Sequence, residues 1–469
     1  MNDASQWYPA LEEKLGGMAR ELKASLRPWA AGGGVFTPEQ AGYLGQGLAT
    51  AFIQAAIDSA HASGGGTVAL GQGDYVSGTL IMRSRVRLMV EEGSRLLAST
   101  SLADYPPQHA RRLTVQDTSM GMHQSLIFAE NCQDIAFSGP GEIDGRGRPE
   151  NFPGDETQQG TPGRPFLLRV IDCRRVHVSG LILRDSPCWM QNYLNCEDLL
   201  IENVTVRNHA NYNNDGFDID GCRRVWMHDC SVHSGDDALC FKGAGQSELN
   251  GVLVENCELL SACNAVKIGT DTQGDFRNIW VRHCSIGGLE KDPSGLKHAG
   301  CDSAVSLEMM DGGTAENILL SDLSIQRAAS PFFMRLEKRG RVKPGDPAPP
   351  IGSLRRAAVA RVRGGQCGPR GSYFLGIPEK SIEDVLLKDV EIRQLPSQKP
   401  VLKEEEIGEM YGVYPDAHMI DPLGDAPAYA LWARHIRGLT LQNYAVFPQG
   451  GESRPAFVLK TDVQARVIS

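Results

Sequence analysis

One arrangement of apolar residues recurs along the chain: two apolar positions with one residue between them, a gap of two residues, and two more apolar positions with one residue between them. Apolar residues at every second position predict a β-strand with one buried face, and the gap predicts a bend in it. The copies are Ile135-Phe137, Val176-Val178-Leu181-Leu183, Leu199-Ile201-Val204-Val206, Val225-Met227-Cys230-Val232, Val252-Val254-Cys257-Leu259, Ile279-Val281-Cys284-Ile286, Ile318-Leu320-Leu323-Ile325, Val359-Val362, Val385-Leu387-Val390-Ile392 and Leu439-Leu441.

The copies are spaced like the turns of a solenoid. From Val176 their first residues advance by 23, 26, 27 and 27 residues, and then by longer intervals that we interpret as loop insertions. A repeat of about 25 residues with short strands and no helix is typical of one coil of a parallel β-helix. Such coils bury their apolar faces only by stacking, and parallel connections are right-handed. We therefore predict an all-β chain that folds as a right-handed, single-stranded parallel β-helix.

The first 75 residues depart from the repeat. Residues 48–62 carry apolar side chains at helical spacing, and three glycines follow them. A helix at the end of a solenoid would cover exposed strand edges. We expect residues 1–75 to form an N-terminal segment with a short capping helix. Residues 76–469 are expected to form one continuous parallel β-helix domain.

A second departure lies near the C-terminal end. Residues 395–427 contain Pro396, Pro400 and three consecutive glutamates, and they lack the repeat. We predict a long excursion there, near the cleft or near one end of the solenoid. Shorter insertions are predicted at residues 287–300 and 339–354, where they would wall off one end of a groove.

The twelve cysteines follow the repeat. A small, polarisable side chain suits a stack of identical core positions. We therefore expect thiol stacks in the core and no disulfides. The two predicted stacks are Cys132, Cys173, Cys196 and Cys222, and Cys230, Cys257 and Cys284.

Charge and hydropathy limit the function classes. The net charge is −10 at pH 7, which argues against nucleic acid because phosphate binding needs a surplus of Lys and Arg. No run of about 18 apolar residues is present, so we expect no membrane partner. Residues 1–30 lack the apolar core of an export signal. This favours a cytoplasmic location, or a periplasmic or secreted one if a signal had been removed. The oligomeric state stays open.

The most unusual segment of the chain contains three acids within six residues, Asp215, Asp218 and Asp220. Asp236 and Asp237 follow about one coil later. Residues one coil apart in a stacked solenoid lie about 4.8 Å from each other, so these acids should converge. Repulsion between them should raise at least one pKa. Glycoside hydrolysis needs this difference, with one protonated acid and one ionised base.

The acids, and the potential metal ligands near them in the sequence, also allow three interpretations other than hydrolysis. Asn and Asp also form turns in any β-helix. Asp215, Asp218 and Asp220 offer oxygen ligands to calcium, but the rest of a calcium loop is missing. His228, Cys230 and His233 have a zinc-like spacing, but the repeat turns Cys230 inward, away from the histidines. We expect no metal and no cofactor.

The chain also resembles glycoside hydrolase family 28, the polygalacturonases and rhamnogalacturonan hydrolases. The strongest resemblance lies in residues 213–218 (NNDGFD) and 235–237 (GDD). Weaker matches lie at 64–68, 88–97, 104–106, 142–145 and 186–189. The family's fold is the pectin-lyase-like solenoid, in agreement with the repeat. The family implies a pectic carbohydrate as substrate.

The resemblance also implies roles for individual residues. Asp236 would be the general acid, and Asp215 and Asp237 would hold and deprotonate the attacking water, so that the anomeric centre inverts. Asn213 would orient the site. We count Asp218 among the substrate-binding residues.

Two positions depart from the family pattern. Asn264 stands where the family carries a histidine, and it offers only a hydrogen bond. Ser306-Leu307-Glu308 stands where polygalacturonases show Arg-Ile-Lys, which grips a galacturonate carboxylate. Glu308 would repel that carboxylate and suit the hydroxyls of a neutral sugar. A rhamnogalacturonan or mixed galacturonate linkage is therefore favoured over plain homogalacturonan.

Other binding residues are expected on the outward face of the strands. Lys242, Lys267 and Arg335 alternate with inward apolar neighbours and offer cations to a carboxylate, although each has an alternative as a solvated surface charge. Trp189 and Tyr193 are candidates for stacking on a sugar ring, or for packing under a loop. The alternative functions are an exo-acting polygalacturonase, a polysaccharide lyase and a non-catalytic carbohydrate-binding solenoid.

Overall fold

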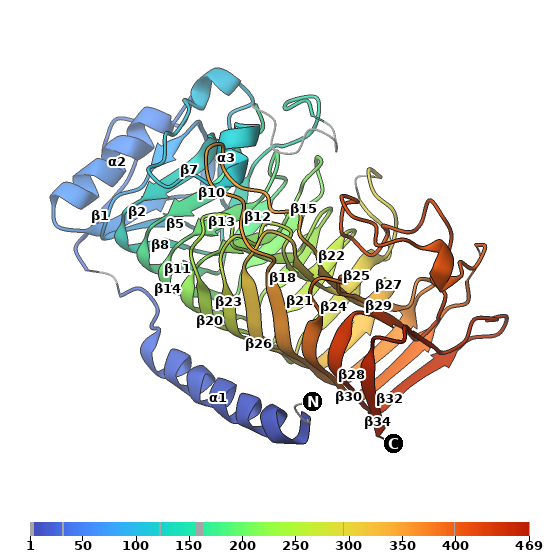
Figure 1. The fold of residues 1–469 in the computed structure, drawn as a ribbon. Helices are drawn as coiled ribbons and strands as arrows, with labels where there is room; N and C mark the ends of the chain where they lie inside the picture. Colours follow the sequence, from blue (N-terminus) through green and yellow to red (C-terminus); the bar gives the residue numbers. More distant parts are fainter. Residues whose placement is uncertain are drawn as a thin grey trace.

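The computed structural model describes residues 4–30, 32–121, 123–154, 163–293, 295–397 and 399–468. The chain winds into an elongated stack of coils whose strands pair in parallel with those of the next coil (Figure 1). Three runs of strands follow the axis of the stack. The predicted all-β, right-handed parallel β-helix is confirmed.

Run 1 is a twelve-stranded parallel sheet within the described residues. One of its faces looks into the core and the other looks outward. Its strands are β4 (Leu80–Ile81), β7 (Ser125–Glu130), β10 (Phe166–Ile171), β13 (Gln191–Leu194), β16 (Phe217–Asp220), β19 (Leu239–Lys242), β22 (Asn264–Ile268), β25 (Cys301–Met309), β27 (Ala328–Leu336), β29 (Ser372–Leu375), β31 (Leu431–Arg434) and β33 (Phe457–Leu459).

Runs 2 and 3 correspond to the two halves of the sequence repeat. Run 2 contains β1 (Gly34–Phe36), β2 (Gly66–Leu70), β5 (Val86–Val90), β8 (Gln133–Ser138), β11 (Arg174–Ser179), β14 (Glu197–Glu202), β17 (Arg223–His228), β20 (Leu249–Glu255) and β23 (Phe276–Arg282). Run 3 contains β3 (Gly73–Ser77), β6 (Ser94–Ala98), β9 (Glu142–Asp144), β12 (Ile182–Arg184), β15 (Thr205–Asn208), β18 (Ser231–Ser234), β21 (Glu258–Ser261) and β24 (Ser285–Gly288).

The bend between runs 2 and 3 is made by single residues with left-handed backbone. Asn203, Asp229 and Asn256 take φ values of 54°, 54° and 55° at this corner of successive coils. Asn and Asp tolerate this conformation better than other residues with a Cβ. Further along, runs 2 and 3 merge into long strands: β26 (Thr314–Gln326), β28 (Ser353–Cys367), β30 (Ile382–Gln394) and β32 (Ile436–Pro448), with β34 (Gln464–Ile468) beside the last.

The core is the continuous column of inward side chains predicted by the repeat. Val176, Leu199, Val225, Val252 and Ile279 pair in register on successive strands and are at most 1% exposed. Every cysteine of the chain is free, and the cysteines of both predicted stacks contact one another in order along the axis. In these stacks one thiol accepts the backbone N–H of a neighbouring cysteine, as Cys222 does from Cys196 over 3.3 Å.

Two longer helices cover different parts of the β-helix. The predicted helix is α2 (Thr50–Ala62), which packs on β1, β2, β4 and β5 at the N-terminal end. The helix α1 (Ala4–Ser25) was not predicted, and it lies along the outside of run 2 (Figure 1). Short helical turns follow at α3 (Val115–Met120), η1 (Leu102–Asp104) and η2 (Glu404–Glu406). In the described part of the chain, no helix combines the length and apolarity needed to cross a membrane.

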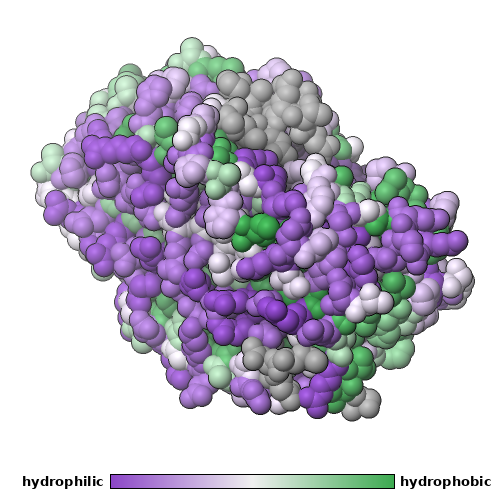
Figure 2. Space-filling view, in the orientation of Figure 1, coloured by the Kyte–Doolittle hydropathy of each residue, from purple (hydrophilic) through white to green (hydrophobic). Residues whose placement is uncertain are grey.

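The buried side of α1 rests on apolar residues that point outward from run 2. Leu15 and Leu22 are buried together with Leu253, Trp280 and Leu319. These strands are therefore apolar on both faces in this region. The face of the molecule shown in Figure 2 is otherwise mainly hydrophilic, with apolar side chains in small groups.

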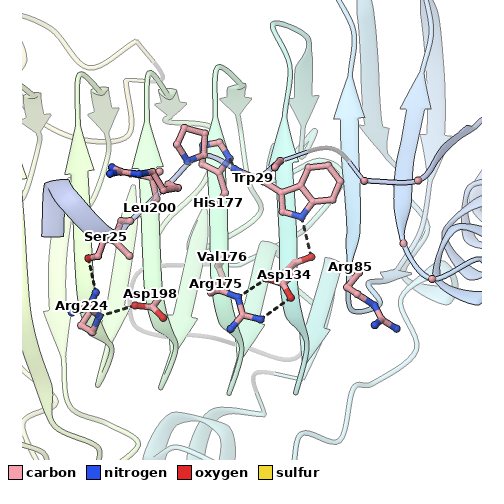
Figure 3. A pocket seen from close by; sticks show the side chains of 18 of the residues that line it. Ser25, Trp29, Arg85, Asp134, Arg175, Val176, His177, Asp198, Leu200 and Arg224 are labelled. Atoms are coloured by element: carbon pink, nitrogen blue, oxygen red, sulfur yellow. Dashed lines mark hydrogen bonds and ion pairs between the residues drawn. The ribbon is translucent and has the colours of Figure 1, made fainter.

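A cavity of about 680 Å³ lies between the end of α1, the following linker and the outer face of run 2 (Figure 3). The Trp29 indole N–H donates to the carbonyl of Asp134 over 3.1 Å. Arg224 bonds Asp198 over 2.7 Å and the Ser25 hydroxyl over 2.6 Å. The cavity is thus framed by the contacts that fasten α1 and its linker, away from the acidic segments on run 1.

Candidate active site

The two acidic segments lie side by side on run 1. Asp215 precedes β16, and Asp236 and Asp237 precede β19, the adjacent strand of the same sheet. The Gly216 N–H donates to the carbonyl of Asp237 over 2.8 Å, and the Asp236 N–H donates to the carbonyl of Asn214 over 3.4 Å. The prediction that stacking brings these distant acids together is confirmed.

Lys242 lies against the first of these segments. Its Nζ is 3.9 Å from Asp215 Oδ2 and 3.3 Å from Asp218 Oδ1, and all three side chains are buried. The ammonium also lies 4.4 Å from the centre of the Trp189 ring. The predicted outward orientation of Lys242 is therefore correct, and in this arrangement its charge is used by two carboxylates and one aromatic face.

Lys267 lies against the second segment. Its Nζ is 3.5 Å from Asp237 Oδ2, 3.5 Å from Glu308 Oε2 and 3.2 Å from Asp416 Oδ1. Its side chain is only 3% exposed, so the ammonium must be paired with these carboxylates to stay charged. Asp416 was missed by the sequence analysis, because it arrives from the excursion at 395–427 and belongs to no repeat. The predicted place of that excursion, near the cleft, is correct.

Two of the three candidate catalytic acids have raised pKa values. Burial raises the pKa of Asp215 well above its usual range, and the neighbouring carboxylates of Asp218 and Asp236 raise it further. Burial also raises the pKa of Asp236, and the adjacent Asp237 adds to this effect. A carboxyl group in such surroundings keeps its proton at a higher pH than usual, as a general acid requires.

Asp237 behaves in the opposite way. Burial acts to raise its pKa, but Lys267 and Lys242, together with hydrogen bonds from Asn264 and Cys263, lower the pKa below the ordinary value. Asp237 is therefore the ionised member of the group. The pKa of Asp236 is raised while that of Asp237 is lowered, and acid–base hydrolysis needs such a difference between two neighbouring carboxyl groups.

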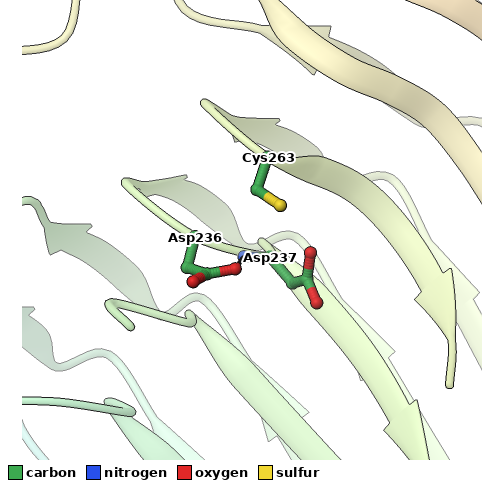
Figure 4. A group of neighbouring side chains, drawn as sticks. All are labelled: Asp236, Asp237 and Cys263. Atoms are coloured by element: carbon green, nitrogen blue, oxygen red, sulfur yellow. Dashed lines mark hydrogen bonds between the residues drawn. The ribbon is translucent and has the colours of Figure 1, made fainter. Parts of the chain in front are cut away.

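Asp236, Asp237 and Cys263 offer ligand atoms that all lie within 4.8 Å of one another (Figure 4). Burial raises the pKa of the Cys263 thiol well above its usual range, and the two aspartates raise it further. The protonated thiol donates a hydrogen bond to Asp237, one of the causes of its low pKa. We therefore interpret Cys263 as a hydrogen-bond donor to the base.

Neither metal reading from the sequence matches this geometry well. Asp218, offered as a calcium ligand, already has the Lys242 ammonium at 3.3 Å, and Asp220 lies near the backbone N–H of Gly245 at 3.5 Å. Cys230 points into the core while His228 contacts the exposed Asp229, so the zinc-like ligands diverge.

Asn213 and Trp189 frame the N-terminal side of the group. The Asn213 backbone is left-handed (φ 53°), and its Oδ1 accepts a hydrogen bond from Arg164 Nη2 over 2.9 Å. Trp189 is half-buried and packs edge-on against Phe166 at 5.7 Å, with its face toward Lys242. Arg164 had no signal in the sequence, because it lies outside the repeat.

Tyr193 does not reach the site. It is fully buried in the core, and its hydroxyl donates to Gln191 Oε1 over 2.7 Å. The suggestion that it stacks on a sugar is wrong, because Tyr193 occupies an inward position of β13. The alternative, a packed aromatic, describes its surroundings.

Glu308 and Arg335 are register partners on β25 and β27, and both side chains are fully buried. Glu308 is bonded by the Ser306 hydroxyl, and burial raises its pKa well above the usual range despite Lys267. Arg335 donates to Glu337 over 3.2 Å and to the carbonyl of Glu409 over 2.7 Å. Arg335 is thus held under the excursion, one coil beyond Glu308.

Known proteins resemble this chain in sequence and in fold. The sequence model of Glycosyl hydrolases family 28 matches residues 107–291. A probable polygalacturonase of Vitis vinifera is 28% identical over 210 residues, 42% of this chain and 42% of that protein. A putative rhamnogalacturonase D of Aspergillus niger is 28% identical over 203 residues, 41% of this chain and 43% of that protein. The chain therefore spans less than half the length of these two relatives.

Solved structures agree on the architecture. An exopolygalacturonase from Thermotoga maritima has a TM-score of 0.69 at 19% identity, covering 81% of this chain and 91% of that one. A family 28 exopolygalacturonase of Yersinia enterocolitica has a TM-score of 0.63 at 16% identity, with 93% and 80% covered. These likenesses concern the fold. The sequence match to glycosyl hydrolases family 28 covers residues 107–291 and therefore includes both acidic segments.

Proposed function

We propose that the protein hydrolyses glycosidic bonds in a pectic poly- or oligosaccharide, with inversion at the anomeric carbon. The supporting observation is the contrast between neighbouring carboxyl groups: the pKa of Asp236 is raised by burial and by Asp237, whereas Lys267 and other neighbours overcome burial and lower the pKa of Asp237. Asp236 gives its proton to the leaving oxygen. Asp237 takes a proton from the attacking water, and the protonated Asp215 holds that water by a hydrogen bond.

The preferred bond is a rhamnogalacturonan or mixed galacturonate linkage. Lys267 is the cation nearest to Asp237, and its charge is already shared with Glu308 and Asp416. A substrate carboxylate beside Lys267 would also face these two acids. A neutral sugar with hydroxyl groups meets no such repulsion and finds acceptor oxygens. Lys242 on the other side of the acids has fewer carboxylates around it, and we assign the galacturonate to that side.

The substrate is a short chain or a chain end. The excursion covers run 1 on one side of the acids, where Phe333, Tyr373 and Trp432 are buried together with Ile420. On the other side Arg164 bonds Asn213 directly beside the acids. A binding surface bounded on both sides in this way would accommodate a few sugar units, which supports an exo mode of action.

The experiment is a screen of defined rhamnogalacturonan and homogalacturonan oligomers, with products followed over time by mass spectrometry and proton NMR. Release of a terminal unit from a mixed oligomer, first as the inverted anomer, is expected. Retention of configuration would contradict the mechanism, and faster cleavage of homogalacturonan would favour a polygalacturonase in the strict sense.

The same screen separates the rival functions. A lyase would give unsaturated products that absorb in the ultraviolet, and a chelator would abolish the activity. A non-catalytic binding solenoid would retain oligomers without cleaving them. The separation of one protonated and one ionised carboxyl group speaks for hydrolysis over both.

A further inference from the structure

Asp416 enters the site from outside the β-helix. Its side chain is 3% exposed, and its Oδ1 accepts hydrogen bonds from Asn264 Nδ2 over 3.0 Å and from Lys267 Nζ over 3.2 Å. The two partners lie 152 and 149 residues earlier in the chain. The contact therefore exists only when the excursion is docked on run 1.

The amide of Asn264 is fully committed by its surroundings. Its Nδ2 donates to Asp237 Oδ1 over 2.7 Å as well as to Asp416, and its Oδ1 accepts from the Ser303 hydroxyl over 2.6 Å. A flipped amide would turn its oxygen toward two carboxylates. Two hydrogen bonds to charged acceptors would be lost, and such bonds are the stronger ones. Asp416 is thus one of two anions that fix the direction of this amide.

Lys267 is placed by the same carboxylate. Without Asp416 its ammonium would keep only Asp237 and Glu308, both at 3.5 Å. The ammonium would then move toward these two groups, and the field at Asp237 would change. Asp416 therefore acts on the base through two intermediaries, an amide and an ammonium.

We propose that Asp416 is a positioning residue that holds Asn264 and Lys267 in the arrangement in which Asp237 accepts a proton from water. The proposal rests on the hydrolytic function proposed above. It also gives a physical reason why asparagine suffices at position 264: the chain supplies, from the excursion, the second anion that orients it.

The excursion has other attachments, and these make a matched control possible. Asp421 pairs with Arg370 over 2.7 Å and with Lys399 over 3.3 Å, and Met419 and Ile420 pack in a buried apolar cluster. Asp421 is thus an acid of the same excursion that fastens it without contacting Asn264 or Lys267 in any contact described above. Asp421→Asn should weaken the attachment of the excursion and leave the contacts of Asp416 with Asn264 and Lys267 unchanged.

The test is a double-mutant cycle on the intact protein with a pectic oligomer that the wild type cleaves. Asp416→Ala should lower kcat by about tenfold or more, because a hydrogen bond to a charged group is lost. In the Asn264→Ala background the same change should lower kcat by less than about twofold, because the amide it orients is gone. Asp416→Asn should restore most of kcat relative to Asp416→Ala, since its amide oxygen still accepts from Asn264.

Several outcomes would overturn the proposal. They are an equal loss of kcat in both backgrounds, a kcat for Asp416→Asn as low as for Asp416→Ala, or an equally strong coupling of Asp421→Asn to Asn264→Ala. If the wild type cleaves no pectic oligomer, the proposed function fails separately. The cycle is then read from free energies of unfolding, and additivity between Asp416→Ala and Asn264→Ala would refute the contact itself.

Discussion

Two regions of the same sheet face can be compared position by position. Near the acids, one outward ladder of run 1 reads Asp218, Cys240 and Lys267 on successive strands. Two coils beyond Lys267, the same ladder reads Phe333, Tyr373 and Trp432 on successive strands. The backbone is the same in both regions, and all six side chains are buried. The first region therefore contains buried charged side chains, and the second contains buried aromatic rings.

The difference lies in what covers each region. The aromatic region is covered by the chain's own excursion, and aromatic area removed from water stabilises the fold. The charged region must be paired internally, because burial of an unpaired charge costs several kcal/mol. A protein retains such a region where a ligand uses it. The contrast therefore supports the proposed site by an argument that does not depend on any motif, and four substitutions test it.

The largest effect is expected from Asp236→Asn. Loss of the general acid should lower kcat by about a thousandfold, within the usual range for this class of group. Stability should not fall, because burial and the adjacent Asp237 raise the pKa of this carboxyl and so make its ionised form unfavourable in the fold. Hydrolysis rates and thermal unfolding measure the two effects. Asp229→Asn, at an exposed bend, is the control with unchanged rate; near-normal activity of Asp236→Asn would remove the acid from the mechanism.

The aromatic region should respond in stability. Trp432→Ala leaves a cavity under the excursion and should reduce the free energy of unfolding by about 4 kcal/mol. The chemistry of the acids is untouched, so kcat should change by less than about threefold. Denaturant unfolding and the same assay provide the measurement. A loss of kcat larger than the loss of stability can explain would mean that the two regions act together.

Lys267→Met tests the charged region for stability. The substitution leaves Asp237, Glu308 and Asp416 without their shared cation, which should cost about 3 kcal/mol. Asp237 has a lowered pKa because Lys267, Lys242 and hydrogen bonds outweigh burial. Its contribution is present above the pKa of the unfolded chain and is lost as pH falls through the folded pKa. The variant should thus lose most stability at neutral pH and least near pH 3, and a pH-independent loss would contradict the pairing.

The smallest effect is expected from Asp220→Asn. Burial, and next the charge of Asp271, raise the pKa of Asp220 to about 7. A carboxyl whose folded pKa exceeds the unfolded value destabilises the fold as pH rises from about 4 to 7. The neutral amide avoids this cost, so the variant should be more stable than the wild type at pH 8 and equal to it at pH 4. Unfolding at both pH values decides, and equal stability at pH 8 would refute the shift.

The sequence predicted the features that recur from coil to coil. Inward positions such as Val225 and Val252, and the register that joins Asp215 to Asp237, follow from a fixed coil length. Contacts made by unrepeated segments were not predictable in the same way. Nothing in the spacing of Asp416 indicates that it meets Asn264, because the path of a long excursion is set by tertiary packing.

The helix α1 was missed for a different reason. Tyr8, Leu11, Leu15 and Leu22 have helical spacing, so a signal for the helix was present. Its docking site was hidden, because an outward residue such as Leu253 lies between the inward residues 252 and 254 and looks like part of one buried strand. Three consecutive apolar residues in a strand indicate that both of its faces are buried. This interpretation would have predicted that another element covers the outer face.

The buried thiols allow local opening of the β-helix to be measured by chemical labelling. Eleven cysteines are buried and only Cys263 is partly accessible, at the edge of the acids. In the folded protein a small alkylating reagent can therefore reach only this thiol, and it should react slowly there, because burial and the two aspartates raise the pKa of Cys263. Each additional label, detected by mass spectrometry of the intact protein, would indicate that another coil has separated from its neighbour. The labelled peptide would identify that coil.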